Sequence, residues 1–401
     1  MIQLKSMLSK FDSDCLIFWF IVLTFAFLTT GTAPAMIAFA LALIIWILSG
    51  KVFRDISVIK QNWFFPVIAL VALHWIGLLY SLDTDLGLDY ALKTKYWIAA
   101  LVTAGIIFNE KRLDILLKWF WAGLLAGAFL AMLQSAGLME PVRKDFPGFG
   151  VVHTLVCMYL IIGILMASLY FRKARSIKAR MVFLAMILIF IFHLAVLKGR
   201  AGYLVFALVS PFVANNIAAR FSIKFRIVAG IILAAALLLS PVVRKVITDS
   251  YEKVSSQKEK LLEGKFDNDV PRFYITHEAV EVFLSHPFRG IGTGSLPVPT
   301  KAHGHRVDHP HNNFLYMGTS FGIIGIAVCA WLFVQMFYLS WKARKTVTGY
   351  FVLSTCGVLF WGGMFDTAIL NNGTLIFLTM TYGMMNSLNE QGQKQALSEN
   401  P

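Results

Sequence analysis

Long apolar segments recur along nearly the whole chain, and short polar or basic stretches separate them. A helix needs about 20 apolar residues to cross a hydrocarbon core, and its backbone groups must be satisfied within the segment. The pattern therefore predicts about 12 membrane-spanning helices and an all-α polytopic membrane protein. The predicted centres lie near Thr24, Leu41, Ala72, Leu101, Leu125, Ile162, Met186, Ala207, Leu233, Cys329, Val358 and Leu378.

The composition excludes a soluble fold. Of the 401 residues, 58% are hydrophobic and 14% are charged, whereas soluble domains are about half apolar and a quarter charged. The net charge of +14 does not indicate nucleic-acid binding, because the basic residues are scattered through short loops. All four cysteines (Cys15, Cys157, Cys329 and Cys356) lie in apolar segments, so we expect no disulfide and no thiol chemistry.

The basic residues predict the orientation. An even number of spans places both termini on one side, and assigning that side to the cytoplasm makes every short cytoplasmic loop basic, as the positive-inside rule requires. These loops carry Lys51, Arg54, Lys60; Lys111, Arg112, Lys118; Arg172, Lys173, Arg175, Lys178, Arg180; Arg220, Lys224, Arg226; and Lys342, Arg344, Lys345.

One large polar segment interrupts the pattern. We predict spans 1 to 9 in residues 1–243, an outer loop in residues 244–312, spans 10 to 12 in residues 313–387 and a cytoplasmic tail in residues 388–401. The loop, between spans 9 and 10, should contain short helices. Gly290, Gly292 and Gly294 predict an irregular return to the membrane.

The outer loop is rich in histidine. Six of the nine histidines lie in it: His277, His286, His303, His305, His309 and His311. The last four have short spacings that could ligate zinc. Without a cysteine or a His-Glu-x-x-His helix, however, solvated loop histidines explain His303 and His305 better, and we expect no metal.

His311 differs because it stands where the loop ends and a span begins. An imidazole can take a proton from an attacking hydroxyl near neutral pH, so His311 is a candidate general base. Pro310 and Asn312 flank it and could fix its approach and tautomer. The alternative is a helix-capping segment with an incidental histidine.

Arg200 stands in a short basic break, Lys198-Gly-Arg-Ala-Gly-Tyr, between two apolar segments on the outer side. Its guanidinium suits phosphate oxygens, and a diphosphate on a lipid carrier would lie at about this depth. The alternative is an arginine that extends to the headgroups. Arg272 and Arg289 are further candidate anion contacts, although Arg289 could instead only shape its turn.

Several short motifs occur together in the second half of the chain. Arg272-Phe-Tyr precedes Ser285-His-Pro-Phe-Arg-Gly-Ile-Gly-Thr-Gly, and His311-Asn312 is followed after nine residues by Gly322 and then by Gly325. This region resembles the hallmark region of the bacterial O-antigen ligase and polymerase superfamily. Arg200 with Leu204 resembles the Arg-x-x-x-Leu motif of that family.

The resemblance implies a glycosyltransferase of the bacterial inner membrane that builds lipopolysaccharide on the periplasmic side. It implies an undecaprenyl diphosphate-linked O-antigen donor, a lipid A core oligosaccharide acceptor, no cofactor or metal, and inversion at the anomeric carbon. By the same resemblance His311 is the base, and Arg200 and Arg272 bind the diphosphate. Neighbouring residues expected to support these three are Lys198, Tyr203, Arg289, Asp308, His309 and Asn312.

Other functions stay open. An O-antigen polymerase would use the same donor with a second lipid-linked glycan as acceptor. A protein O-oligosaccharyltransferase would generally be longer at its C-terminal end. A transporter or lipid flippase fits the span number but should show repeats and mid-membrane charges, and a zinc-dependent membrane hydrolase would rest on the clustered histidines alone.

Overall fold

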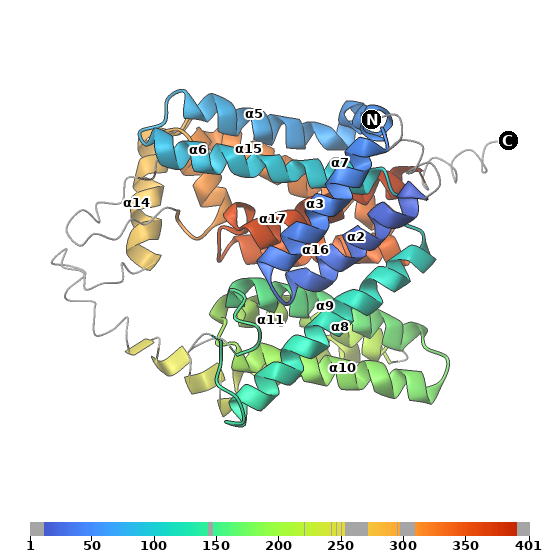
Figure 1. Ribbon diagram of the computed structural model, residues 1–401. Helices are drawn as coiled ribbons and strands as arrows, with labels where there is room; N and C mark the ends of the chain where they lie inside the picture. The colour runs from blue at the N-terminus through green and yellow to red at the C-terminus, as the bar shows by residue number, and fades with distance from the viewer. Residues whose placement is uncertain are drawn as a thin grey trace.

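The computed structural model describes residues 12–142, 147–219, 221–241, 243–245, 247–249, 251–252, 272–294, 296 and 309–390. Helices make up most of this part of the chain, and no strand occurs in it (Figure 1). The predicted all-α class is therefore confirmed.

The first half of the chain forms a series of helices joined by short turns. They are α2 (Ser13–Leu28), α3 (Thr32–Leu48), α4 (Val52–Asp55), η1 (Ile56–Lys60), η2 (Asn62–Phe64), α5 (Phe65–Leu78), α6 (Thr84–Lys93), η3 (Thr94–Trp97), α7 (Ile98–Ala104), α8 (Glu110–Ser135), α9 (His153–Lys173) and α10 (Ile177–Val196), where η marks a 3₁₀ helix.

The second half continues in the same way on either side of the large polar segment. It contains α11 (Arg200–Ile217), α12 (Ile223–Leu238), α14 (Arg272–Ser285), α15 (Asn313–Lys342), α16 (Val347–Gly363), η5 (Ala368–Leu370) and α17 (Asn372–Gly383). Every predicted span centre falls within a helix of this series.

Judged by helix length and composition, the described helices provide fewer membrane spans than the predicted 12. Four helices (α8, α9, α10 and α15) are long and apolar enough to cross a membrane, and up to six spans result if two bent helix pairs each count as one. One pair, Thr32–Leu48 with Val52–Lys60, bends by 90°. The predicted count is therefore not confirmed.

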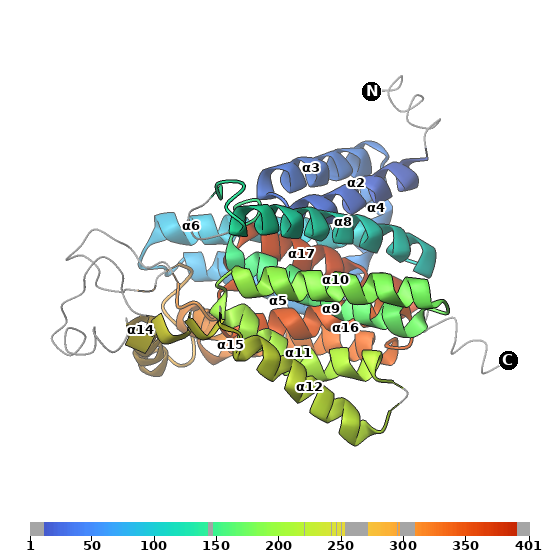
Figure 2. The same ribbon diagram turned by 90° about the horizontal axis from the view of Figure 1, so that it is seen from below.

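The core of the bundle lies around α9 and α17. Most of α9 is buried, and so is every residue of α17 from Gly373 to Gly383. The Phe377 ring lies 4.9 Å from that of Tyr159 and 5.0 Å from that of Phe25, so α17 joins α9 to the N-terminal hairpin. Figure 2 shows α10, α9 and α16 side by side.

The basic loops gather at one end of the bundle. Lys51 pairs with Asp14 near the start of α2, and Lys173 lies 3.8 Å from Glu110. Near the end of the described chain, Ser387 accepts a hydrogen bond of 2.9 Å from the Phe108 N–H. The first and last described helices therefore meet the basic loops at the same end, as the predicted topology requires. Which side of a membrane this end faces stays a prediction.

Candidate active site

The predicted base stands at the start of α15, where two asparagines bind the α16–α17 loop. Asn312 caps α15 by accepting a hydrogen bond from the Leu315 N–H (2.9 Å), and its amide donates to the Met364 carbonyl (3.0 Å). The next residue, Asn313, accepts from the Ile369 N–H (3.2 Å). The residue before this pair, His311, is thus held at a fixed junction of two segments.

His311 has a left-handed backbone conformation, with φ at 51°. Such a value is uncommon for a residue other than glycine and persists only where the surroundings impose it. The Nδ1 atom of His311 lies 3.4 Å from Oδ1 of Asp366, and the two side chains are 31% and 24% exposed. The same carboxylate oxygen accepts a hydrogen bond from the Thr367 N–H (2.9 Å). The contact directs Nδ1 toward a fixed carboxylate and turns Nε2 away from it.

This pairing allows proton transfer. A carboxylate beside one ring nitrogen favours the tautomer whose other nitrogen can accept a proton, and it stabilises the imidazolium that forms. From the sequence alone Asp366 is a candidate polar contact that surface solvation explains equally well, and nothing pairs it with His311, which lies 55 residues away in a different loop. Only its position, in a polar break between two apolar segments, distinguished it.

His309 supports the same turn. Its ring centroid lies 4.5 Å from that of His311, nearly perpendicular to it, and its Nδ1 accepts a hydrogen bond from the His311 N–H (3.4 Å). The supporting role expected for His309 stays a prediction. Asp308, His303 and His305 lie outside the described residues.

The glycine motif corresponds to a break in α15. At Gly322 the backbone leaves the helix with φ at 65° and ψ at −154°. The Thr319 and Ser320 carbonyls before the break accept hydrogen bonds from the N–H groups of Ile291 (2.9 Å) and Gly292 (3.0 Å). After the break, the Ile323 N–H donates to the Pro287 carbonyl (2.7 Å). The glycine-rich return therefore passes across α15 where its own hydrogen bonding is interrupted.

The same return binds the α5–α6 hairpin. Thr293 donates from its hydroxyl to the His74 carbonyl (2.7 Å), and Tyr80 donates to the Arg289 carbonyl (2.9 Å). The Arg289 guanidinium lies over the Tyr80 ring at 5.9 Å. Burial raises the pKa of Tyr80, and the charge of Arg289 opposes that rise. Arg289 is exposed, and its described contacts are with this hairpin rather than with His311.

Arg200 begins α11, after a strained turn. Lys198 has φ at 52°. Within the described part of the chain, Lys198 and His311 are the residues other than glycine that have a positive φ. The Arg200 side chain is exposed and makes no hydrogen bond or ion pair with any residue that the structure describes. Tyr203 is buried, and its hydroxyl donates to the Ala195 carbonyl (2.9 Å). Tyr203 thus stabilises the turn, while the guanidinium lies beside the electropositive end of an 18-residue helix.

The two predicted arginines are placed differently. Arg272 begins α14, which packs against α15 at the end of the bundle beside the α5–α6 hairpin (Figure 1), and its side chain lies outside the described part. The turn of Arg200 lies beside the start of α9, because a Cβ at Gly199 would be 3.5 Å from His153. The start of α17 lies near the same helix, since a Cβ at Gly373 would be 3.3 Å from Leu155. The Arg200 turn and the loop of Asp366 therefore share one end of the bundle.

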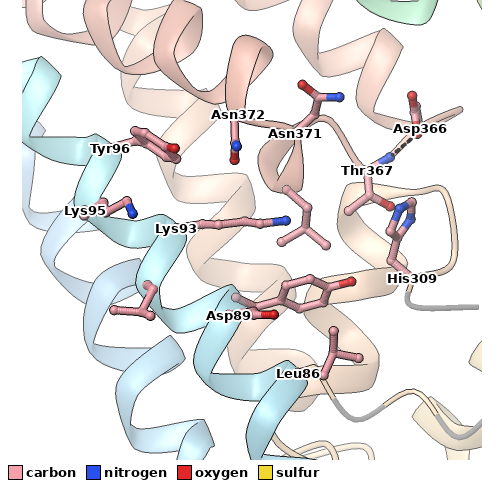
Figure 3. Close-up of a pocket in the computed structure, with 13 residues that line it drawn as sticks. Leu86, Asp89, Lys93, Lys95, Tyr96, His309, Asp366, Thr367, Asn371 and Asn372 are labelled. Carbon is pink, nitrogen blue, oxygen red and sulfur yellow. Dashed lines mark hydrogen bonds between the residues drawn. The ribbon is translucent and has the colours of Figure 1, made fainter. Parts of the chain in front are cut away.

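A pocket of about 530 Å³ adjoins the His311–Asp366 pair. Figure 3 shows α6 and η3 on one side of it and the loops before α15 and α17 on the other. Residues that line it include Lys93, Lys95, Tyr96, His309, Asp366 and Asn371. Lys93 and Lys95 could not be selected from the sequence, because they belong to a segment predicted only as a span.

Possible metal ligands come together at one place within the described chain. His277, Glu278 and Glu281 of α14 have ligand atoms within 4.8 Å of one another. His277 lies 3.6 Å from Glu281, and both side chains are exposed. This arrangement is explained by an ordinary contact between residues one helical turn apart.

Comparison with known families bears on the same region. Residues 185–330 match the family model described as O-antigen ligase. The matched segment contains Arg200, Arg272, His311 and the glycine break of α15. The resemblance to the O-antigen ligase and polymerase superfamily is therefore confirmed over this segment. None of the curated proteins matches the chain.

Proposed function

From the O-antigen ligase match of residues 185–330, we propose that this chain is a membrane glycosyltransferase that completes lipopolysaccharide. Its donor is an O-antigen glycan on undecaprenyl diphosphate, and its acceptor is the lipid A core oligosaccharide. The observation that carries the proposal is the His311–Asp366 pair, held by a strained turn at the start of α15.

His311 acts as the general base. The acceptor hydroxyl attacks the anomeric carbon of the donor sugar, and its proton passes to Nε2 of His311. Asp366 faces Nδ1 at 3.4 Å and stabilises the positive charge of the imidazolium. A new bond forms between the acceptor oxygen and the anomeric carbon, while the bond to the diphosphate oxygen breaks with its electron pair. One displacement of this kind inverts the anomeric carbon.

The leaving diphosphate needs charge neutralisation more than a proton. Arg200 and Arg272 supply it, because guanidinium groups form paired, charge-assisted hydrogen bonds to phosphate oxygens. The exposed position of Arg200 at the start of α11 supports this role, since the helix terminus also favours an anion. With two guanidinium groups at the diphosphate, the reaction requires no metal ion.

The reaction takes place on the periplasmic face of the inner membrane. The His311–Asp366 pair and its pocket belong to the loops before α15 and α17. The basic loops, the start of α2 and Ser387 lie together at the other end of the bundle. Because basic loops remain in the cytoplasm, this arrangement supports cytoplasmic termini and a periplasmic site.

The test is glycan transfer with purified protein, lipid-linked donor and lipid A core acceptor, with and without EDTA. His311→Ala should lower kcat by about 10² to 10⁴, the usual contribution of a positioned base. Lys345→Ala, an exposed lysine in a basic loop, is the matched control and should retain activity. EDTA should have no effect.

Three outcomes would contradict the proposal in different ways. If the wild type extends lipid-linked glycan and ignores the core acceptor, the protein is a polymerase. If His311→Ala stays fully active, the base is a different residue. If EDTA stops transfer, a metal ion takes part.

A further inference from the structure

The pocket beside the catalytic pair has a wall in which the charges balance. Its volume of about 530 Å³ falls in the range of ligand sites, about 300 to 1,000 Å³. Lys93 and Lys95 contribute two positive charges to the lining. Asp89 and Asp366 contribute two negative charges. With His309 neutral, the described part of the wall carries no net charge, so it favours neither an acidic nor a basic ligand.

The lining also argues against an apolar ligand such as a lipid tail. Among the described residues that line the pocket, Leu86, Leu92 and Leu370 are apolar and the others are polar. A lipid tail would cover these polar groups without forming hydrogen bonds to them, which is unfavourable for each group. The wall instead suits an uncharged ligand that forms several hydrogen bonds.

The two tyrosines of the wall leave little ring surface for a ligand. Tyr90 and Tyr96 are buried. The Lys93 ammonium lies 4.7 Å from the centre of the Tyr90 ring, and the Lys95 ammonium lies 5.5 Å from that of Tyr96. Because the lysines already lie over these rings, recognition of a ligand in this pocket depends on hydrogen bonds rather than on stacking.

Asn372 offers such hydrogen bonds from the start of α17. Its side chain is exposed, lines the pocket, and forms no hydrogen bond with any part of the chain that the structure describes. Figure 3 shows it extending toward the wall that carries Tyr96 and Lys93. A side-chain amide has two donor hydrogens and an acceptor oxygen, which matches a sugar hydroxyl that both donates and accepts.

Asn371 adds a second amide in a fixed orientation. Its Oδ1 accepts a hydrogen bond from the Gly373 N–H (3.1 Å) and so caps α17. Its Nδ2 has no acceptor among the described residues. Because the cap holds the oxygen, the nitrogen of this pocket-lining amide is left to donate to a ligand or to water.

The two amides lie close to the proposed base. Asp366 lines the same pocket and lies 3.4 Å from Nδ1 of His311. Arg200, which is proposed to hold the donor diphosphate, is not among the described residues that line this pocket. The position therefore favours the acceptor over the donor as the source of the ligand.

We propose that this pocket binds an uncharged sugar of the acceptor glycan and that Asn371 and Asn372 recognise its hydroxyl groups. The inference rests on the proposed function and deepens it by naming the chemical class of the acceptor sugar. It makes the two asparagines specificity-determining residues. The donor glycan also carries sugar hydroxyls, so the experiment must distinguish the two sources.

The first experiment measures transfer to a core oligosaccharide that ends in an uncharged hexose. In Asn372→Ala the KM for this acceptor should rise about three- to tenfold, the effect of losing one hydrogen bond between uncharged groups. The value of kcat and the KM for the donor should stay as in the wild type. Asn371→Ser keeps a capping oxygen, loses the amide nitrogen, and should raise the acceptor KM similarly.

The matched control is Asn62→Ala. Asn62 is an exposed asparagine in η2, next to the basic loop that contains Lys60. This substitution should leave both KM values unchanged. A rise in the donor KM of Asn372→Ala, with the acceptor KM unchanged, would assign the pocket to the donor glycan and overturn the proposal. Unchanged values for both substrates would mean that the pocket holds only water, and would overturn it as well.

Modified acceptors test the hydroxyl contact and the absence of charge. Among analogues that each lack one non-attacking hydroxyl of the terminal hexose, one should show the same KM with wild type and Asn372→Ala, because the contact is already lost. If Asn372→Ala raises the KM for every analogue by the same factor, its amide binds none of these hydroxyls and the proposal fails. A phosphate on the terminal hexose should not improve binding. A KM at least tenfold lower for the phosphorylated acceptor would exclude the uncharged class.

A binding measurement separates this inference from the proposed function. Calorimetry of the purified protein with the uncharged oligosaccharide, without donor, should show binding that Asn372→Ala weakens about three- to tenfold. If the wild type transfers no glycan but still shows this binding, the proposed function fails and the sugar pocket stands. Equal binding by wild type and Asn372→Ala would overturn the pocket assignment.

Discussion

Replacing Gly322 by alanine tests whether the break in α15 holds the candidate site together. A Cβ at this position would lie 2.5 Å from the Phe288 carbonyl oxygen and 2.6 Å from that of Pro287. These atoms belong to the backbone of the glycine-rich return and cannot rotate away. The backbone angles of 65° and −154° add strain of about 1 to 3 kcal/mol for any residue with a side chain.

The structural cost of the substitution can be worked out from these contacts. Forcing an extra methyl group into a filled space costs about 1 to 3 kcal/mol. Displacing the return would also weaken the hydrogen bond from Ile323 to Pro287, which is 2.7 Å long. Strain and overpacking together come to about 2 to 6 kcal/mol, enough to lower the unfolding midpoint by several degrees. Activity should fall further, because the first part of α15 carries His311.

Thermal unfolding in detergent measures this effect through the buried thiols. Cys157, Cys329 and Cys356 are buried, so a thiol-reactive dye labels them only when the bundle opens. Gly357→Ala is the matched control, because Gly357 lies within α16 and an added Cβ would meet no atom within 4 Å. It should be neutral, or stabilising by up to about 1 kcal/mol. Equal midpoints and equal activities for the two variants would refute the reasoning.

Two further substitutions address the reacting groups. Asp366→Asn removes the charge beside His311 and should lower kcat by at least about tenfold while changing the acceptor KM little. The reason is that the carboxylate acts on the imidazolium that forms during reaction. An unchanged kcat would show that Asp366 only shapes its loop. Arg200→Lys should raise the donor KM about tenfold, since an ammonium cannot form the paired contact of a guanidinium. Arg344→Lys, in an exposed basic loop, is its control, and full donor affinity in Arg200→Lys would exclude a paired contact.

The helical architecture could be predicted because the backbone N–H and C=O groups of each apolar segment must form hydrogen bonds with one another inside a membrane. The number of spans could not. The segment around Leu101 divides into α6, η3 and α7, and α3 and α4 form a sharply bent pair. Apolar length alone does not show where a helix bends.

The candidate site was predictable only where its residues are neighbours in the sequence. His311 and Asn312 stand at a visible border between loop and span, so their position was informative. Asp366 reaches His311 across 55 residues, and Lys93 reaches the pocket from the end of α6. Such contacts depend on which helices pack together, and one sequence does not contain that information. Tyr203 stands near Arg200 in sequence, yet its hydroxyl binds backbone at Ala195.

The hydrogen bonds around α15 also determine when this site can form during biosynthesis. Thr293 forms a hydrogen bond with His74, a residue that was synthesised 219 residues earlier in the chain. Asn312 and Asn313 can form their hydrogen bonds only after Met364 and Ile369, near the end of the chain, have been synthesised. No nascent chain that stops before residue 369 can have the complete turn around His311. The turn that holds His311, the proposed base, is therefore complete only after nearly the whole protein has been synthesised, and a prematurely terminated chain would lack these contacts.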